Sequence, residues 1–168
     1  MSKTKHVVTM LTAISLGGIA YTQNKEGTVL QPYKDSGGVV TIGTGSTVYE
    51  DGTKVQITDP PITKERATEL LKAHMSKDAK IFNKTLLGIP ITQGEYDLYL
   101  DFTYQYGTGA WSKSLVLKNL KEGKYKQACA ALLQYKYVAK RDCSIRRNNC
   151  FGVWIRQKER YSKCMGEQ

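Results

Sequence analysis

The sequence predicts an α+β fold, with a small β-hairpin region, a long helix after it and a mainly helical remainder. Three observations support this prediction. Positions 25–47 combine glycines with β-forming residues, as hairpins do. Apolar residues recur at helical spacing over positions 63–86, and further helical patterns follow from Thr92 onward.

Length, composition and charge bound the possible functions. With 168 residues, the chain is long enough for one domain with a substantial core. Its hydrophobic content of 40% and charged content of 24% are typical of globular proteins. The formal net charge of +10 indicates an anionic polymer or surface as the partner, and nucleic acid, anionic lipid and bacterial cell wall all qualify. We expect the chain to act as a monomer.

The first 24 residues form a segment of their own. Lys3 and Lys5 precede a stretch, residues 7–24, that contains no Asp, Glu, Lys or Arg. At ~1.5 Å per residue in a helix, this stretch spans roughly 27 Å, just short of a hydrocarbon core of ~30 Å. Its glycine, serine and threonine residues dilute its hydrophobicity. We therefore expect a segment that inserts into a membrane only weakly.

Two other interpretations of residues 1–24 stay open. A helical face is formed by residues that recur at helical spacing, as in the first helix of a soluble fold: Val7, Met10, Leu11 and Ile14, continued by Gly17, Gly18 and Tyr21. Small residues at 18–20 also fit a cleaved signal peptide. We favour the membrane anchor, and we predict a signal-anchor segment or first helix over residues 1–24 and one domain over residues 25–168.

The glycine-rich stretch holds two acids and a hydroxyl at fixed spacing. Eight residues separate Glu26 from Asp35, and five separate Asp35 from Thr41. Residues 36–38 predict a turn and residues 39–42 a strand, so Asp35 and Thr41 are expected on one hairpin. Glu26 is expected at the end of the preceding helical segment.

This arrangement suits hydrolysis of a glycosidic bond. The reaction needs one protonated carboxyl to protonate the leaving oxygen and one ionised carboxyl to activate water or attack the sugar. Glu26, beside an apolar segment, is the better candidate for a raised pKa, whereas Asp35 in a polar turn is expected to stay ionised. Thr41 is neutral and short, which suits it to hold a water molecule. Each residue alone has an ordinary structural explanation, and only the joint pattern indicates a site.

The remaining elements follow in order. Residues 49–61 predict a second hairpin turn at Asp51-Gly52, and a helix capped by Thr63 runs to about Leu86. Another helix covers residues 92–106 and ends at Gly107. Shorter helices are expected from the region of Trp111 to about Glu122 and over Tyr125 to Tyr137.

Other chemistries lack their motifs. Gly43-x-Gly45 lacks the third glycine and the lysine of a phosphate-binding loop. With histidines at positions 6 and 74 and no C-x2-C pair, we expect no metal site, and no cofactor. The basic tail between Arg141 and Lys163 lacks the motifs of nucleic-acid binders, so we expect no nucleic-acid partner. A solvated face or an aid to approaching the cell wall explains that tail instead.

The four cysteines, next to an export segment, indicate an oxidising compartment. If residues 152–164 form one helix, Cys150 and Cys164 lie roughly 20 Å apart, beyond the ~7 Å Cα limit for a disulfide. That excludes one of the three possible pairings. Two stay open, and we favour Cys143 with Cys150 and Cys129 with Cys164.

Residues 26–47 resemble the phage-type lysozymes, glycoside hydrolase family 24. That family has a Glu, an Asp and a Thr at the spacing of Glu26, Asp35 and Thr41, and residues 33–38 and 41–45 match its aromatic-x-Asp and Thr-Ile-Gly-x-Gly blocks. Ser46 departs from the pattern, because many members have His there, and no role of that His is carried over. The resemblance extends more loosely over residues 24–164.

The resemblance implies a lysozyme-like fold with the active-site cleft between two lobes, and a catalytic domain over residues 25–168. It implies a phage endolysin that hydrolyses the β-1,4 bond between N-acetylmuramic acid and N-acetylglucosamine in peptidoglycan, its partner. Glu26 is then the general acid, Asp35 the base or charge stabiliser, and Thr41 the residue that holds the water. Tyr33 and Gln105 are expected to bind substrate.

A subgroup of this family, the signal-anchor-release endolysins, begins with glycine-rich, weakly apolar segments that residues 1–24 resemble. We therefore expect this segment to hold the protein at the bacterial inner membrane and then to release it into the periplasm, where it causes host cell lysis. The alternatives are a lytic transglycosylase, and a non-catalytic cationic protein that binds wall or membrane.

Overall fold

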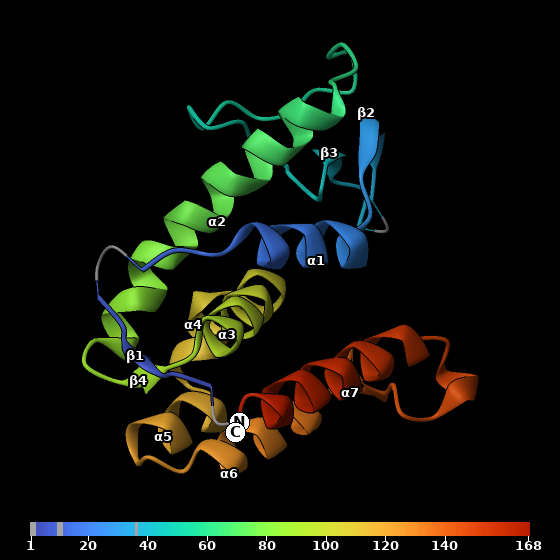
Figure 1. The fold of residues 1–168 in the computed structure, drawn as a ribbon. Coiled ribbons are helices and arrows are strands. Elements are labelled where there is room, and N and C mark those ends of the chain that lie inside the picture. The colour runs from blue at the N-terminus through green and yellow to red at the C-terminus, as the bar shows by residue number, and fades with distance from the viewer. Residues whose placement is uncertain (1–2, 10–11, 36) are drawn as a thin grey trace. The chain divides into compact units, whose positions relative to one another are not determined.

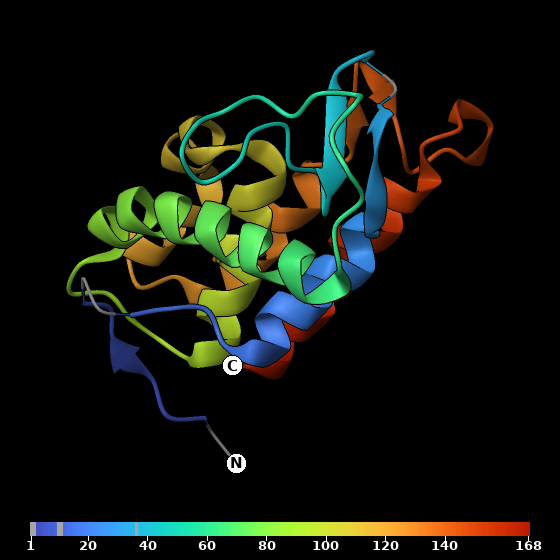
Figure 2. The same cartoon turned by 90° about the horizontal axis from the view of Figure 1, so that it is seen from above.

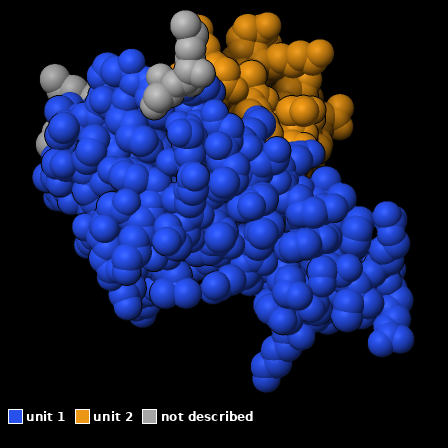
Figure 3. Space-filling view, turned by 60° about the horizontal axis from the view of Figure 1, so that its bottom comes forward, with its two compact units in different colours: residues 1–12, 81–168 blue, residues 13–80 orange. Residues whose placement is uncertain are grey.

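The computed structural model describes residues 3–9, 12–35 and 37–168. The chain forms two compact units, which Figure 3 shows in different colours. The hairpin unit comprises residues 13–80, and the helical unit comprises residues 1–12 and 81–168. Small antiparallel sheets beside many helices confirm the predicted α+β class.

The hairpin unit begins with helix α1 (Leu16–Glu26) and continues into strands β2 (Val29–Lys34) and β3 (Val40–Gly43). Ser15 caps α1 by accepting a hydrogen bond at 3.0 Å from a backbone amide of the first turn. Gly27 ends the helix with a φ of 76°, a conformation that glycine adopts without strain. Figures 1 and 2 show the two antiparallel strands side by side, directly after α1.

A small apolar core holds the hairpin unit together. Its fully buried members are Ile42, Val55 and Leu70, against which Val40, Tyr49 and Ile62 pack. The predicted second hairpin turn is confirmed by an antiparallel bridge that joins Val48 to Lys54.

The predicted long helix is α2 (Lys64–Leu86). Its first part supplies the buried Ala67, Leu70, Leu71 and Met75 to the hairpin unit. From Ile81 onward its residues belong to the helical unit.

The helical unit is built around helix α3 (Gln93–Tyr106). Thr92 and Glu95 form a capping box at its start. Gly107 ends it, as the sequence predicts. The other helices are α4 (Thr108–Ser112), α5 (Leu115–Lys121), α6 (Tyr125–Ala131) and α7 (Phe151–Gly166), with short 3-10 turns at Leu132–Gln134 and Arg146–Asn148.

Aromatic side chains form the centre of the helical unit. The Trp111 ring lies 4.9 Å from the Phe82 ring and 5.6 Å from the Tyr99 ring, measured between centroids. All three residues are fully buried. The Trp111 indole N–H donates to the Thr85 hydroxyl at 2.8 Å, so its one polar group is satisfied.

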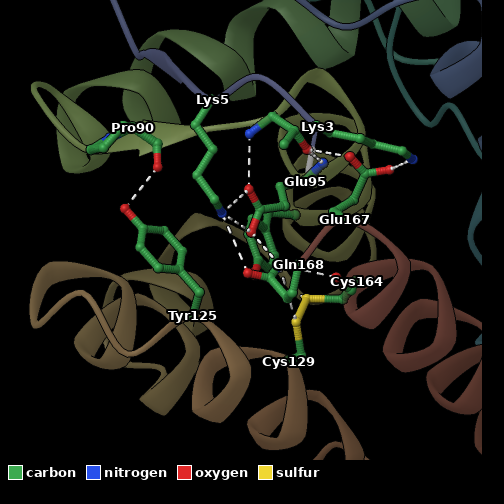
Figure 4. A network of polar contacts seen from close by, with 11 residues as sticks. Lys3, Lys5, Pro90, Glu95, Tyr125, Cys129, Cys164, Glu167 and Gln168 are labelled. Atoms are coloured by element: carbon green, nitrogen blue, oxygen red, sulfur yellow. Dashed lines mark hydrogen bonds and ion pairs between the residues drawn. A yellow bond between two sulfur atoms is a disulfide. The ribbon is translucent and has the colours of Figure 1, made fainter. Parts of the chain in front are cut away.

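Residues 3–9, here called the N-terminal arm, are part of the helical unit. Strand β1 (His6–Val7) pairs antiparallel with β4 (Pro90–Ile91). Lys5 Nζ donates to both carboxylate oxygens of Glu95, at 3.0 and 2.9 Å, and lies 3.7 Å from the centroid of the Tyr125 ring. Figure 4 shows Lys5 between these two partners. Because Glu95 is 0% exposed, the arm supplies the counter-ion that this buried carboxylate needs.

The favoured disulfide pairing is confirmed. Cys129 bonds to Cys164 with a Cα–Cα distance of 5.5 Å, and Cys143 bonds to Cys150 with 4.9 Å. The first disulfide ties α6 to α7, and the second closes a loop directly before α7.

The expected helical stripe over residues 7–14 is wrong where the structure describes it. Val7 lies in strand β1 and Ile14 lies outside any helix, whereas Met10 and Leu11 lie outside the described residues. Pairing with β4 decides the conformation of Val7, a contact more than eighty residues away along the chain. Helix α1 then begins only after Ser15, and it contains the later residues of that face, Gly17, Gly18 and Tyr21.

The expected helix over residues 125–137 is also too long. Helix α6 ends at Ala131, and Tyr137 lies in β5 (Tyr137–Val138), which pairs with β6 (Arg141–Asp142). The cause is tertiary, because the Tyr135 ring packs 4.6 Å from the Phe102 ring, and the Tyr135 carbonyl accepts a hydrogen bond from Tyr106. The short helix α4 was not anticipated separately.

A division at residue 24 stays a prediction, and helix α1 runs through that position. Among the described residues, no helix combines the length and the hydrophobicity needed to cross a bilayer.

Candidate active site

Glu26 is the last residue of α1, and its side chain is exposed. Only Gly27 and Thr28 separate it from strand β2. The Thr28 and Thr44 hydroxyls lie 3.2 Å apart in a hydrogen bond, and Val29 pairs with Gly43. The end of the helix is therefore tied to the end of β3, which sets where Glu26 leaves the backbone.

Asp35 lies in the turn of the hairpin, half-buried, where its carboxylate folds back onto the backbone. The amides of Gly37 and Val39 donate to its Oδ1 at 2.8 and 2.9 Å. Such local bonds are typical of aspartate in turns. Both bonds use the same carboxylate oxygen, so Oδ2 can accept a bond from a ligand or water.

Val39 links Asp35 to Thr41. Its carbonyl accepts from the Asp35 amide at 2.9 Å and from the Thr41 hydroxyl at 3.1 Å, while its own amide donates to Asp35 Oδ1. One peptide residue therefore positions the acid and the hydroxyl together. Sequence reasoning missed this link, because it uses backbone atoms and carries no residue-type signal.

Tyr33 and Thr41 are direct partners across the hairpin. Opposite residues of an antiparallel pair place their side chains on the same face. Thr41 is 3% exposed, and Tyr33 is half-buried. The structure thus brings Asp35 and Thr41 together on one hairpin, as the sequence predicts, and it adds Tyr33 to them.

The backbone conformation at the end of β3 explains the two glycines, Gly43 and Gly45. Ile42 and Ser46 exchange backbone hydrogen bonds at 2.9 and 3.0 Å around a tight turn. Gly43 and Gly45 adopt φ values of 65° and 82°, which other residues rarely adopt. This turn explains the Gly-x-Gly pattern without a phosphate ligand.

Gln105 belongs to the helical unit, near the end of α3. Its side-chain oxygen accepts a hydrogen bond from Arg160 Nη1 at 2.7 Å, and Arg160 also binds the buried Asp101. The amide therefore has a structural partner of its own. Its role in binding substrate stays a prediction.

One ion pair of the hairpin unit joins α2 to the loop after β3. Arg66 binds both oxygens of Glu50, and this hydrogen bonding lowers the Glu50 pKa to about 2. Burial raises the pKa of Asp78. Among the described residues, no three His, Cys, Asp or Glu side chains gather as a metal site requires.

Comparisons with known proteins bear on the family and the fold of this chain. The phage lysozyme family model matches residues 23–149. The endolysin of Salmonella phage P22 is 35% identical over 129 residues, which are 76% of this chain and 86% of that protein. The SAR-endolysin of Escherichia phage 933W is 30% identical over 148 residues, or 87% of this chain and 82% of that protein.

A solved structure agrees as well. The crystal structure of a P22 lysozyme mutant superposes with a TM-score of 0.78 at 30% identity, covering 92% of this chain and 99% of that one. The lysozyme-like fold expected from the sequence is thus confirmed. Family model, relatives and fold agree over most of the chain, which therefore belongs to the phage lysozyme family.

Proposed function

We propose that Glu26, Asp35 and Thr41 are the catalytic residues that hydrolyse the glycosidic bond of the substrate. As a member of the phage lysozyme family, the chain is a muramidase and a phage endolysin, and it hydrolyses the β-1,4 bond between N-acetylmuramic acid and N-acetylglucosamine in peptidoglycan. The observation that carries the residue assignment is the hydrogen-bonded link through Val39, which joins Asp35 to Thr41.

Glu26 is proposed as the general acid. A proton donor must reach the leaving oxygen of a bulky polymer, so it has to be accessible. Glu26 is exposed and projects from the end of a helix that the Thr28 and Thr44 hydrogen bond ties to the hairpin. Its backbone position is therefore well defined while its carboxyl stays within reach of substrate.

Asp35 and Thr41 are proposed to place the attacking water. The Thr41 hydroxyl donates its proton to the Val39 carbonyl, so its oxygen can accept a bond from water. Asp35 Oδ2 can accept the second water proton and draw it away during attack. This division of roles corresponds to inversion at the sugar carbon, since the carboxylate activates water and does not attack directly.

Tyr33 and Gln105 are proposed as substrate-binding residues. Tyr33 offers an aromatic ring beside Thr41 on the hairpin. Gln105 retains its amide nitrogen as a donor when Arg160 occupies its oxygen. We propose that the enzyme works as a monomer.

Product analysis on purified peptidoglycan tests the proposed water-placing site. Hydrolysis leaves a reducing muramic acid end, whereas a transglycosylase leaves a 1,6-anhydro end. We expect reducing ends only. A 1,6-anhydro product from the wild-type protein would remove the need for a water held by Thr41.

Substitutions at Asp35 and Thr41 that keep the shape of the side chain test the contribution of the Asp35 charge and of the Thr41 hydroxyl to activity. Asp35→Asn keeps the acceptor for the turn amides and loses the charge, so we expect activity to fall by roughly 10²-fold or more. Thr41→Val keeps the shape and loses the hydroxyl, which we expect to cost about tenfold. Rates of reducing-end release measure both effects.

Thr41→Ser is the matched control, because it restores the hydroxyl and is expected to retain most activity. Thermal unfolding followed by circular dichroism checks that each variant folds. An Asp35→Asn enzyme as active as the wild type would rule out the base role.

We also propose that residues 7–24 first hold the protein at the inner membrane and later join the folded periplasmic enzyme. SAR-endolysins among the relatives support this proposal. The N-terminal arm adds a structural reason. While residues 7–24 lie in a bilayer, Lys5 cannot reach Glu95, and a buried carboxylate of the helical unit lacks its counter-ion. The tethered state is then incompletely folded and inactive.

Strengthening the apolar character of α1 is expected to trap the membrane state. Gly17 and Ala20 are exposed, so leucine fits at both positions, whereas Gly18 is buried. Gly17→Leu with Ala20→Leu favours insertion by about 1 kcal/mol on transfer scales. We expect more protein in the membrane fraction and delayed lysis.

Glutamine at the same two positions is the control, since it makes the same backbone change without the hydrophobicity. Normal lysis timing and a soluble protein from the leucine variant would count against membrane retention and favour simple secretion.

A further inference from the structure

A basic surface lies outside the proposed catalytic residues, at the start of α7. Between positions 136 and 158 the chain has seven lysine and arginine residues and a single acid, Asp142. Lys136 binds Asp142 at 2.8 Å, so this acid does not offset the other cations. The exposed cations of this segment are Lys140, Arg141, Arg146, Arg147 and Lys158.

Helix α7 has two distinct faces at this end. One face carries the buried Arg156, Gln157, Arg160 and Cys164 into the helical unit. Phe151, Trp154, Ile155 and Lys158 follow the spacing i, i+3, i+4, i+7, which places them together on another face. On this face, Ile155 is 38% exposed, Lys158 is exposed, and the two aromatic residues are half-buried.

The loop before α7 joins the same surface. The Cys143 to Cys150 disulfide closes this loop, and the Arg146 guanidinium lies 4.3 Å from the centroid of the Phe151 ring. Lys158 lies 5.7 Å from the same ring on the helix side. One loop cation, Arg146, and one helix cation, Lys158, are therefore held beside the same aromatic ring. Ile145, next to Arg146 in the chain, is 41% exposed.

The mixture of side chains decides which partner fits. A polyanion such as nucleic acid, or a hydrated wall glycan, is attracted by the cations but makes no use of exposed isoleucines. A bilayer with anionic headgroups uses both, because cations bind the headgroups while tryptophan and aliphatic side chains enter the interface. We propose that an amphiphilic patch binds anionic phospholipid bilayers, and that it comprises Ile145, Arg146, Arg147, Trp154, Ile155 and Lys158.

The patch is independent of the hydrolytic reaction and of the anchor segment. It lies on the folded helical unit, so it keeps the enzyme at a membrane surface after residues 7–24 have left the bilayer.

Tryptophan fluorescence of the full, disulfide-bonded chain reports on this surface. The chain has two tryptophans, and Trp111 is 0% exposed, so a change on binding reports on Trp154. We expect a blue shift with vesicles of phosphatidylglycerol and phosphatidylcholine, weakened by high salt, and no shift with phosphatidylcholine alone. Co-sedimentation gives the bound fraction in parallel.

Two charge-reversed variants locate the binding surface. Arg146→Glu with Arg147→Glu changes the patch, and Lys118→Glu with Lys121→Glu changes exposed positions of α5 by the same charge. Both lower the net charge from +10 to +6, a change of 4, and both keep residues 1–24. We expect the first to weaken vesicle binding by about 30-fold and the second by less than about threefold. Ile155→Ser, with its charge unchanged, is expected to reduce the blue shift.

Equal losses in the two charge variants would overturn the proposal, because net charge alone would then explain binding. A fluorescence change with soluble peptidoglycan fragments and none with vesicles would assign the patch to glycan instead. Rates on purified peptidoglycan are expected to be unchanged in the patch variants, so failure of the muramidase assignment is detected separately.

Discussion

Glu26→Gln is expected to abolish peptidoglycan hydrolysis while the protein still folds. Glutamine keeps the size of the side chain and removes the proton that the leaving oxygen requires. General acid catalysis contributes roughly 10² to 10⁴ in rate, so the loss is expected in that range. Because Glu26 is exposed at the end of α1, the exchange removes no core packing. Reducing-end release from purified peptidoglycan measures the effect.

Glu69→Gln is the matched control, since Glu69 is an exposed glutamate on α2 in the same hairpin unit. We expect its activity within twofold of the wild type, and both variants are expected to unfold at nearly the wild-type temperature. A Glu26→Gln enzyme that kept more than about a tenth of the wild-type rate would place the acid elsewhere.

The largest stability loss is expected from Asp101→Asn in the helical unit. Asp101 is 0% exposed and accepts hydrogen bonds from Arg156 Nη2 and Arg160 Nε, both at 2.9 Å. Arg160 is also 0% exposed. The exchange removes the negative charge that these two buried guanidinium groups share, which costs about 3–5 kcal/mol. In a chain of this length, the melting temperature is then expected to fall by about 6–20 °C.

Asp97→Asn provides the comparison, because Asp97 lies on the same helix one turn earlier and is partly exposed. We expect it to cost less than about 1 kcal/mol. Thermal unfolding by circular dichroism measures both variants. Equal melting temperatures for the two would show that the Asp101 network contributes no more than a surface charge.

The hairpin with its candidate residues was predictable because its determinants are local. The turn at residues 36–38 and the Gly43-x-Gly45 pattern specify backbone conformations within a few positions, so Asp35 and Thr41 were expected on one hairpin. The helices α2 and α3 were predictable for the same reason, since their periodicity and their end signals act within one element.

Helix geometry also reduced the number of possible disulfide pairings. The length of α7 separates Cys150 from Cys164, which removed one pairing before any contact was known. Choosing between the other two depends on how α6 lies against α7, and local sequence does not encode that arrangement.

By itself, the sequence determined the family, the spacing of Glu26, Asp35 and Thr41, and most of the helices, because these depend on neighbours along the chain. Only the tertiary structure decided three features. The N-terminal arm pairs with β4 and offers Lys5 to buried Glu95, Tyr135 stops a helix by packing on Phe102, and Val39 joins Asp35 to Thr41 through its backbone. The first two features depend on residues far apart in the chain, and the third depends on backbone atoms. For that reason no local sequence pattern predicts any of the three.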